Sequence, residues 1–203
     1  MSGERSGGPE RAIGSGRPER ARLFVALDLP ADVREALQEW RRAALAGGEG
    51  VRPIALQDLH VTLCFLGWRA IGDLGAIAAA CAVVRGRGAV ELRLGEPVAL
   101  PRRRPRVLAM ALEDTDAELA SAQAALSDAL HAGGFYEPEE RPFYGHVTVA
   151  RAGRRARIPR TALLASPPPD LRFHATDVVL YRSHLRRSGA SYEPLERIAL
   201  GSA

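Results

Sequence analysis

The chain has 203 residues, 46% of them hydrophobic, which is enough for one globular domain with a substantial core. No stretch approaches the roughly 18 uninterrupted apolar residues of a membrane-spanning helix, and the N-terminus lacks the apolar segment of a secretory signal. Two cysteines give no disulfide framework. We therefore expect a cytoplasmic protein with reduced thiols, monomeric and without a membrane partner.

The elements predicted along the chain follow a polar, Gly- and Pro-rich tail over residues 1–20, which we expect to be disordered. Residues 21–203 are expected to form a single domain. Its predicted elements are a strand (22–30), a helix (31–45), a strand (59–67), a helix (71–86), two strands (89–100, 106–112), a helix (114–134) and three strands (146–151, 171–183, 191–200). This order is typical of an α+β fold with antiparallel sheets covered by helices.

Two of these strands contain the same pattern, His-Val-Thr-aliphatic, 86 positions apart. Because side chains alternate between the two faces of a strand, His60 and Thr62 share one face, as do His146 and Thr148. The aliphatic residues between them point into the core. If the two strands lie near each other, two imidazoles and two hydroxyls converge on one cleft.

This set of side chains suits a phosphodiester. Thr hydroxyls donate to phosphate oxygens without adding charge, and two imidazoles can divide the work of a general base and a general acid near neutral pH. A single His-x-Thr is more often a half-buried structural feature, but two copies are much less expected by chance. The scheme requires no metal and no cofactor, and neither strand has a set of ligands with zinc spacing.

Cys64 and the arginines need separate interpretations. Simple alternation places Cys64 on the same face as His60, about 13 Å away along the strand, so we expect it at the rim of the cleft and chemically inert. All 28 basic residues are Arg, and they cluster at 101–106 and 151–160. These clusters are either solvated loops or contacts for an anionic partner.

Five blocks of the sequence (22–30, 59–67, 104–112, 134–151 and 180–200) together resemble the bacterial and archaeal RNA 2′,3′-cyclic phosphodiesterases. These proteins, long labelled 2′-5′ RNA ligases, belong to the two-histidine phosphoesterase superfamily. The resemblance implies a bilobal fold, in which two pseudo-symmetric antiparallel sheets face a central cleft and the helices lie outside. It also implies metal-independent opening of an RNA or nucleotide 2′,3′-cyclic phosphate to a 2′-phosphomonoester.

Carried over position by position, the resemblance makes His60 and His146 the catalytic pair. His60 is then the acid that protonates the departing 3′ oxygen, and His146 is the base that acts on water. Thr62, Thr148 and Arg151 are the expected phosphate-binding residues. Arg151 lies three positions beyond Thr148, so simple alternation requires a bend in the strand before Arg151 reaches the site.

One departure from the family pattern is Gly145, which stands where the family usually has Pro before the second His, and which permits more freedom in the preceding loop. Two other functions stay open at this point. The protein could act on small cyclic or 2′-5′-linked nucleotides, including ligation in the reverse direction, or it could be a non-catalytic RNA-binding module.

Overall fold

The computed structural model describes residues 19–46, 49–153, 155–163, 166–186 and 189–202. Its helices and strands are β1 (Arg20–Asp28), α1 (Ala31–Ala44), β2 (Val51–Pro53), β3 (His60–Ala70), α2 (Leu74–Cys81), β4 (Val90–Leu100), β5 (Val107–Glu113), α3 (Glu118–Ala132), β6 (His146–Ala152), β7 (Arg172–Ala175), β8 (Asp177–Arg186) and β9 (Gly189–Ala199). Most of the predicted tail lies outside the described residues, and Arg20 already belongs to β1.

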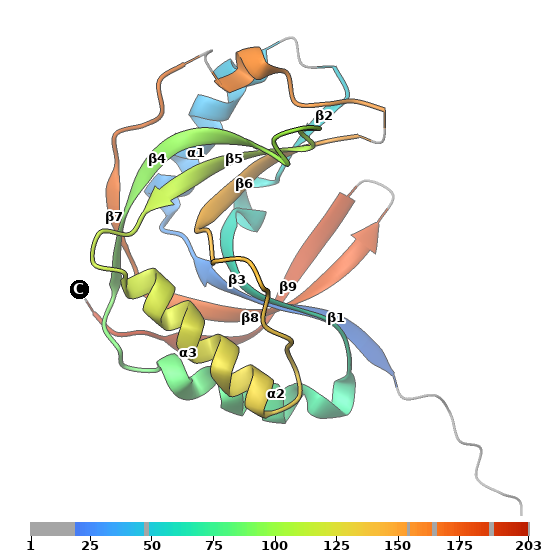
Figure 1. Ribbon diagram of the computed structural model, residues 1–203, viewed down its shortest axis with the longest axis vertical. Helices are drawn as coiled ribbons and strands as arrows, with labels where there is room; N and C mark the ends of the chain where they lie inside the picture. The colour runs from blue at the N-terminus through green and yellow to red at the C-terminus, as the bar shows by residue number, and fades with distance from the viewer. Residues whose placement is uncertain (1–18, 47–48, 154, 164–165, 187–188, 203) are drawn as a thin grey trace, which may run out of the picture.

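The strands form one curled antiparallel sheet in the order β7-β4-β5-β6-β3-β1-β8-β9, with β2 added beside β6 (Figure 1). The ladder between β3 and β6 joins two halves, β7-β4-β5-β6 and β3-β1-β8-β9. It is short: its one residue pair is Val61 with Val147. The two predicted sheets are thus the two halves of a continuous sheet, and the α+β class and the two-lobed arrangement are confirmed.

The helices cross between the two halves in the same way twice. Helix α1 follows β1 but packs on β6 of the other half, where the Arg41 guanidinium donates to the Val149 carbonyl at 3.1 Å. Helix α3 follows β5 but packs beside α2 and against β3, where the Gln123 amide reaches the Leu63 carbonyl at 3.5 Å. After each of these helices the chain continues to a strand that carries a His-x-Thr motif. The two halves therefore repeat the order of their elements as well as the motif.

Apolar clusters lie on both faces of the sheet. The main core lies between the sheet and the helices, and it includes the buried face predicted for α1, namely Val33, Leu37, Trp40 and Ala44. A small second cluster of Phe24, Ala26, Val179 and Tyr181, with Tyr192 packed against it, lies on the opposite face of β1, β8 and β9. We call this opposite face of the whole sheet the inner face.

The boundaries of several elements differ from the sequence prediction. The helix predicted over 71–86 is an α-helix only at its centre, with a 3₁₀ turn on each side. Helix α3 begins at Glu118 rather than at residue 114, because the Asp114 carboxylate accepts the backbone N–H groups of Leu119 and Ala120 at 3.1 and 2.9 Å. The short strand β2 was not predicted.

Candidate active site

The two His-x-Thr motifs meet at the junction of the two halves. The central residues of the motifs, Val61 and Val147, are the residues paired between β3 and β6, and both are fully buried in the core. In an antiparallel pair, the flanking residues on each side then share the inner face. This places His60 beside Thr148 and Thr62 beside His146.

The two histidines are diagonal neighbours in this arrangement. Diagonal partners in a regular antiparallel ladder lie about 7–8 Å apart, a separation that leaves room for one phosphate between the two rings. The two histidines and two threonines, predicted to converge from strand alternation, are therefore brought together by the single pair of Val61 with Val147.

Both imidazoles are oriented by the same local hydrogen bond. The Nδ1–H of His60 donates to the carbonyl of Asp58 at 2.7 Å, and the Nδ1–H of His146 donates to the carbonyl of Tyr144 at 2.8 Å. A carbonyl only accepts, so each ring carries its proton on Nδ1 and leaves Nε2 for chemistry. The Nε2 of His60 lies 3.1 Å from the Thr62 hydroxyl, which donates to it in the neutral form.

The surroundings of the two rings differ. His60 is enclosed by aromatic side chains, with ring centroids 4.9 Å from Phe24, 5.1 Å from Tyr192 and 6.2 Å from Tyr181. Burial among these rings lowers the pKa of His60 to about 4, against the smaller raising effect of its bond to the Asp58 carbonyl. His60 is therefore neutral at pH 7 in the free protein.

His146 has an open environment on its own side of the site. Its ring stacks on Tyr144 at 5.8 Å between centroids, and the Tyr144 side chain is half exposed. Sequence analysis did not identify the aromatic enclosure of His60, because Phe24, Tyr181 and Tyr192 come from strands distant in sequence. The alternation within those strands gave no signal that they face a histidine.

A β-bulge brings Arg151 onto the inner face. In the ladder between β5 and β6, Leu108 pairs with Ala150 and Ala109 pairs with Thr148, so Val149 is an extra residue on β6. Val149 and Ala150 both point into the core and are fully buried, which resets the alternation. Arg151 then shares the face of Thr148, and this bulge is the bend that the sequence prediction required.

The electrostatic field agrees with this position of Arg151. Its exposed guanidinium is close enough to His60 to contribute to the lowered pKa of that imidazole. Burial raises the pKa of Tyr192, and the charge of Arg151 offsets part of that rise. Arg151 therefore supplies positive charge beside the two motifs, which is the arrangement that an anionic phosphate needs.

The same bulge occurs one residue after the first motif and corrects the prediction for Cys64. Val25 pairs with Cys64 and Ala26 with Thr62, so Leu63 is the extra residue. Cys64 is fully buried in the main core instead of at the rim of the site, and burial raises the pKa of its thiol to about 12. Its expected inertness fits this position, and Phe65, 45% exposed, takes the place on the inner face.

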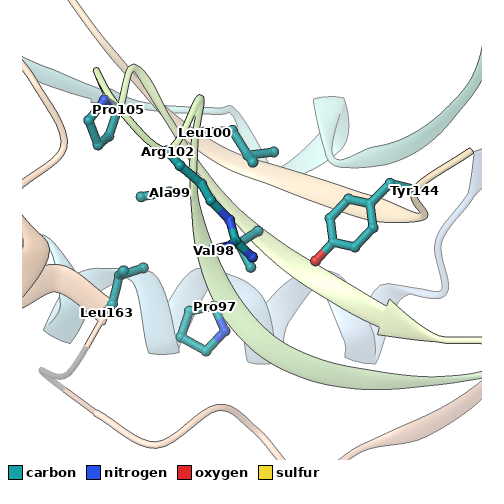
Figure 2. A pocket seen from close by; sticks show the side chains of 8 residues that line it. All are labelled: Pro97, Val98, Ala99, Leu100, Arg102, Pro105, Tyr144 and Leu163. Carbon is teal, nitrogen blue, oxygen red and sulfur yellow. The ribbon is translucent and has the colours of Figure 1, made fainter. Parts of the chain in front are cut away.

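A cavity of about 420 Å³ lies beside part of the two His-x-Thr motifs. Thr62, Phe65, Tyr144 and His146 line it, and its outer wall comes from the loop before β6, including Glu139 and Arg141. A larger cavity of about 690 Å³ adjoins it and shares Leu100 and Tyr144 (Figure 2). Its remaining lining residues are Pro97, Val98, Ala99, Arg102, Pro105 and Leu163.

Figure 2 shows the Tyr144 ring standing apart from the other lining residues, across the larger cavity from Leu163. The lining of this cavity is mainly apolar and includes neither histidine nor threonine of the two motifs. The smaller cavity, which Thr62 and His146 line, is therefore the one that adjoins the motifs.

The two arginine clusters differ in their relation to the site. From the first, Arg102 lines the larger cavity, whereas the guanidinium of Arg106 donates to the carbonyl of Gly153 at 2.9 Å. From the second, Arg151 reaches the site, Arg155 and Arg157 are exposed, and Arg154 lies outside the described residues. Arg102 thus lines the larger cavity, and Arg151 lies on the face of the two motifs.

Gly145 is held by packing rather than left free. Its carbonyl accepts the backbone N–H of Leu112 at 3.0 Å, and a Cβ at this position would come within 2.9 Å of the Cδ2 of Leu119. Because Leu119 is 1% exposed on α3, that contact is not easily relieved. The absence of a side chain therefore lets α3 pack closely against the loop that carries the Tyr144 carbonyl.

The other histidines have partners away from the site. His131 bonds to the Tyr136 carbonyl at 3.0 Å, His184 to Glu193 at 2.7 Å, and His174 lies 3.7 Å from Glu91. Within the described part of the chain, no group of three or more His, Cys, Asp or Glu residues is arranged to hold a metal ion. No helix of that part is long and apolar enough to span a membrane.

Comparison with known proteins gives consistent matches over most of the chain. RNA 2′,3′-cyclic phosphodiesterase from Escherichia coli (strain K12) is 32% identical over 185 residues, which are 90% of this chain and 98% of the relative. The protein of the same name from Thermus thermophilus is 32% identical over 186 residues, covering 88% and 90% of the two chains.

Solved structures agree with these sequence matches. A crystal structure from Thermus thermophilus superposes with a TM-score of 0.75 at 28% identity, covering 88% of this chain and 97% of that one. Escherichia coli LigT complexed with 3′-AMP gives 0.71 at 30% identity, covering 90% and 99%. The family model described as the 2′-5′ RNA ligase superfamily matches residues 29–187. The chain therefore belongs to the 2′-5′ RNA ligase superfamily.

Proposed function

We propose that the protein hydrolyses RNA ends that carry a 2′,3′-cyclic phosphate and leaves a 2′-phosphomonoester. The observation that carries this proposal is the pairing of Val61 with Val147, which sets the two His-x-Thr motifs antiparallel on one face with both Nε2 atoms unprotonated in the neutral rings. The names of the relatives from Escherichia coli and Thermus thermophilus support the same substrate.

In the proposed reaction, one imidazole takes a proton from water as the water oxygen attacks phosphorus. The bond from phosphorus to the 3′ oxygen breaks, and the other imidazole gives a proton to that oxygen. Thr62, Thr148 and Arg151 bind the non-bridging oxygens. No step needs a metal, so hydrolysis is expected to continue in EDTA.

The division of roles assigns His146 as the base and His60 as the acid. Because burial keeps His60 neutral in the free protein, this assignment requires the anionic phosphodiester to raise the pKa of His60 when it binds. The field of Arg151 acts against protonation of His60 until the phosphate neutralises it. His60 would then gain its proton in the complex.

The function is tested with an oligoribonucleotide that ends in a 2′,3′-cyclic phosphate, incubated with the full chain and EDTA. We expect 2′-phosphate ends, and we expect His60→Ala and His146→Ala each to lower kcat by about 10²–10⁴-fold. His174→Ala, on the edge strand β7, is the matched control and should retain wild-type turnover. Wild-type turnover in either active-site variant would refute the mechanism.

The assignment of acid and base is tested with a p-nitrophenyl phosphodiester, whose leaving group departs without protonation. The variant that lacks the acid should lose little activity on this substrate, and the variant that lacks the base should lose as much as on RNA. We expect His60→Ala to be the variant that is rescued. Rescue of His146→Ala instead would reverse the two roles and leave the overall reaction unchanged.

We also propose that the protein acts in the cytoplasm as a monomer. Both cysteines are free and fully buried, which suits a reducing compartment. Light scattering coupled to size-exclusion chromatography should give a mass near 21.8 kDa, and twice that mass would contradict the monomer.

A further inference from the structure

A third hollow lies on the inner face at the far end of β3 from the motif. Its volume is about 360 Å³, and its walls come from β1, β3 and β8. The side chains that matter are those of Arg20, Arg22, Trp68, Ser183 and Leu185. None of them is used in the proposed reaction.

Trp68 reaches the inner face because of a second bulge in β3. Phe24 pairs with Phe65 and Leu23 with Gly67, so Leu66 is an extra residue, and Gly67 has a positive φ of 71°. Trp68 then pairs with Arg22 across the ladder and shares its face. The side chain of Trp68 is 52% exposed, and Leu185 of β8 is 65% exposed.

An exposed tryptophan and leucine among arginines indicate a surface that meets a partner. The charge of the hollow selects the kind of partner. Its lining residues include three arginines, Arg20, Arg22 and Arg182, and no carboxylate. The nearest acids lie at its margin: Glu19 is 3.8 Å from Arg182, and Glu193 bonds to His184. An anionic partner with flat rings fits this combination of charge and aromatic surface.

Arg22 links the hollow to the active-site cavity. The guanidinium of Arg22 lies over the ring of Phe65, 4.6 Å from its centroid, and Phe65 lines the cavity that holds Thr62 and His146. Arg22 also donates to the Ser183 hydroxyl at 3.1 Å, which fixes it between the two hollows. A chain leaving the active site along β3 therefore meets Arg22 and then Trp68.

We propose that this hollow binds nucleotides of the RNA strand upstream of the reacting end, with Trp68 stacking on a base and Arg20 and Arg22 contacting phosphates. The proposal rests on the proposed function. A 2′,3′-cyclic phosphate is by its chemistry the 3′ end of the strand, so every other nucleotide extends in the 5′ direction. Aromatic stacking together with a positive groove is the usual way to hold a single strand without reading its sequence.

The experiment compares kcat/KM on a mononucleotide 2′,3′-cyclic phosphate and on a tetraribonucleotide with the same end. The wild-type protein should prefer the tetranucleotide. Trp68→Ala should lower kcat/KM on the tetranucleotide by roughly 5- to 100-fold, which corresponds to the loss of one stacked base, and leave the mononucleotide unchanged. Trp68→Phe should restore most of the preference.

Salt dependence tests the arginines. Arg22→Gln should make the slope of log(kcat/KM) against log[salt] on the tetranucleotide shallower by about 0.7, the value for one lost phosphate contact on a single strand. Arg85→Gln, exposed at the end of the 3₁₀ turn after α2, is the control and should keep the wild-type slope. Equal slopes for both variants would overturn the assignment of Arg22.

A binding readout separates this proposal from the proposed function. The chain has two tryptophans, and Trp40 is buried in α1, so Trp40→Phe protein reports on Trp68 alone. Adding a tetraribonucleotide with a 2′-phosphate end should quench this fluorescence even if no turnover is found. Absence of quenching, or equal kcat/KM for mononucleotide and tetranucleotide, would overturn the proposal and would indicate that Trp68 serves another partner, such as a protein.

Discussion

Two histidines with the same local hydrogen bond occupy different environments in this protein. His60 lies among Phe24, Tyr181 and Tyr192, whereas His146 stacks on a half-exposed Tyr144. The local bond fixes which nitrogen is reactive, and the surroundings fix how readily His60 accepts a proton. Two copies of the same His-Val-Thr sequence can therefore have different roles in one reaction.

The lowered pKa of His60 predicts a pH dependence of stability. The pKa falls from 6.5 to about 4 on folding, so the unfolded chain binds more protons between these values. The contribution of His60 is fully present above pH 6.5 and is lost as the pH falls toward 4, by up to about 3 kcal/mol. Urea unfolding of wild type and His60→Gln at pH 7.5 and pH 4 should show the larger loss in the wild type.

The difference in the free energy of unfolding between wild type and His60→Gln removes the contribution of all other titrating groups, because both proteins share them. If the free energies of unfolding of wild type and His60→Gln fall in parallel with pH, the burial of His60 does not have the effect inferred from its aromatic enclosure. The expected result is a smaller pH effect in the variant, because glutamine does not titrate.

At the scale of the element, bulges determine which residues face the substrate. Each motif strand has an extra residue directly after its threonine, Leu63 in β3 and Val149 in β6. A strict period of two would put Cys64 on the inner face and Arg151 in the core. The bulges reverse both placements and supply Phe65 and Arg151 at corresponding positions, five residues after each histidine.

The bulge at Gly67 predicts a conformational cost for any side chain there. Its φ of 71° lies in the left-handed region, and a Cβ would meet only the Phe65 ring, at 4.0 Å. Gly67→Ala should therefore destabilise the protein by about 1–2 kcal/mol through the backbone, without a steric clash. If the bulge opens to relieve this strain, Trp68 also loses its position and the preference for longer RNA falls.

The control for this substitution is Gly72→Ala, where φ is not in the left-handed region and no atom lies within 4 Å of the added Cβ. Urea unfolding should leave Gly72→Ala close to wild type. Equal stability of Gly67→Ala and Gly72→Ala would show that the positive φ at residue 67 carries no cost.

At the scale of the whole molecule, the two halves are tied together by more than the ladder at Val61 and Val147. Helix α1 follows β1 of one half and packs on β6 of the other, and α3 follows β5 and packs against β3 in the opposite direction. Each lobe is thus completed by a helix from the other part of the chain. The main core contains residues of both halves, and we therefore propose that residues 21–203 form one domain.

This arrangement predicts a single cooperative unfolding transition. Far-ultraviolet circular dichroism follows the whole sheet, and fluorescence of Trp68→Phe protein follows Trp40, which is buried where α1 covers the other half. The two signals should change at the same urea concentration. Two separated transitions would mean that the lobes fold independently and would contradict the single domain.

Much of the fold followed from local patterns. The α+β class, the order of the main strands and helices and the buried face of α1 depend on alternation and on helical spacing, which act over a few residues. The boundaries were less predictable. The Asp114 carboxylate lies outside α3 and accepts N–H groups of its first turn, and β2 is too short to show a pattern. The prediction for Cys64 was wrong because an inserted residue in a strand leaves no mark in a hydrophobic run.

The sequence by itself determined the two motifs, the pairing of each histidine with a threonine on one face, and the family. Tertiary structure alone decided what lies around them. The Val61–Val147 pair brings residues 86 positions apart into contact, and three distant strands enclose His60 in aromatic rings. Register shifts place Arg151 and Trp68 on the inner face. The physical reason is that register and burial are set by packing between strands. The periodicity of hydrophobic residues in the sequence indicates only which side chains of one strand share a face.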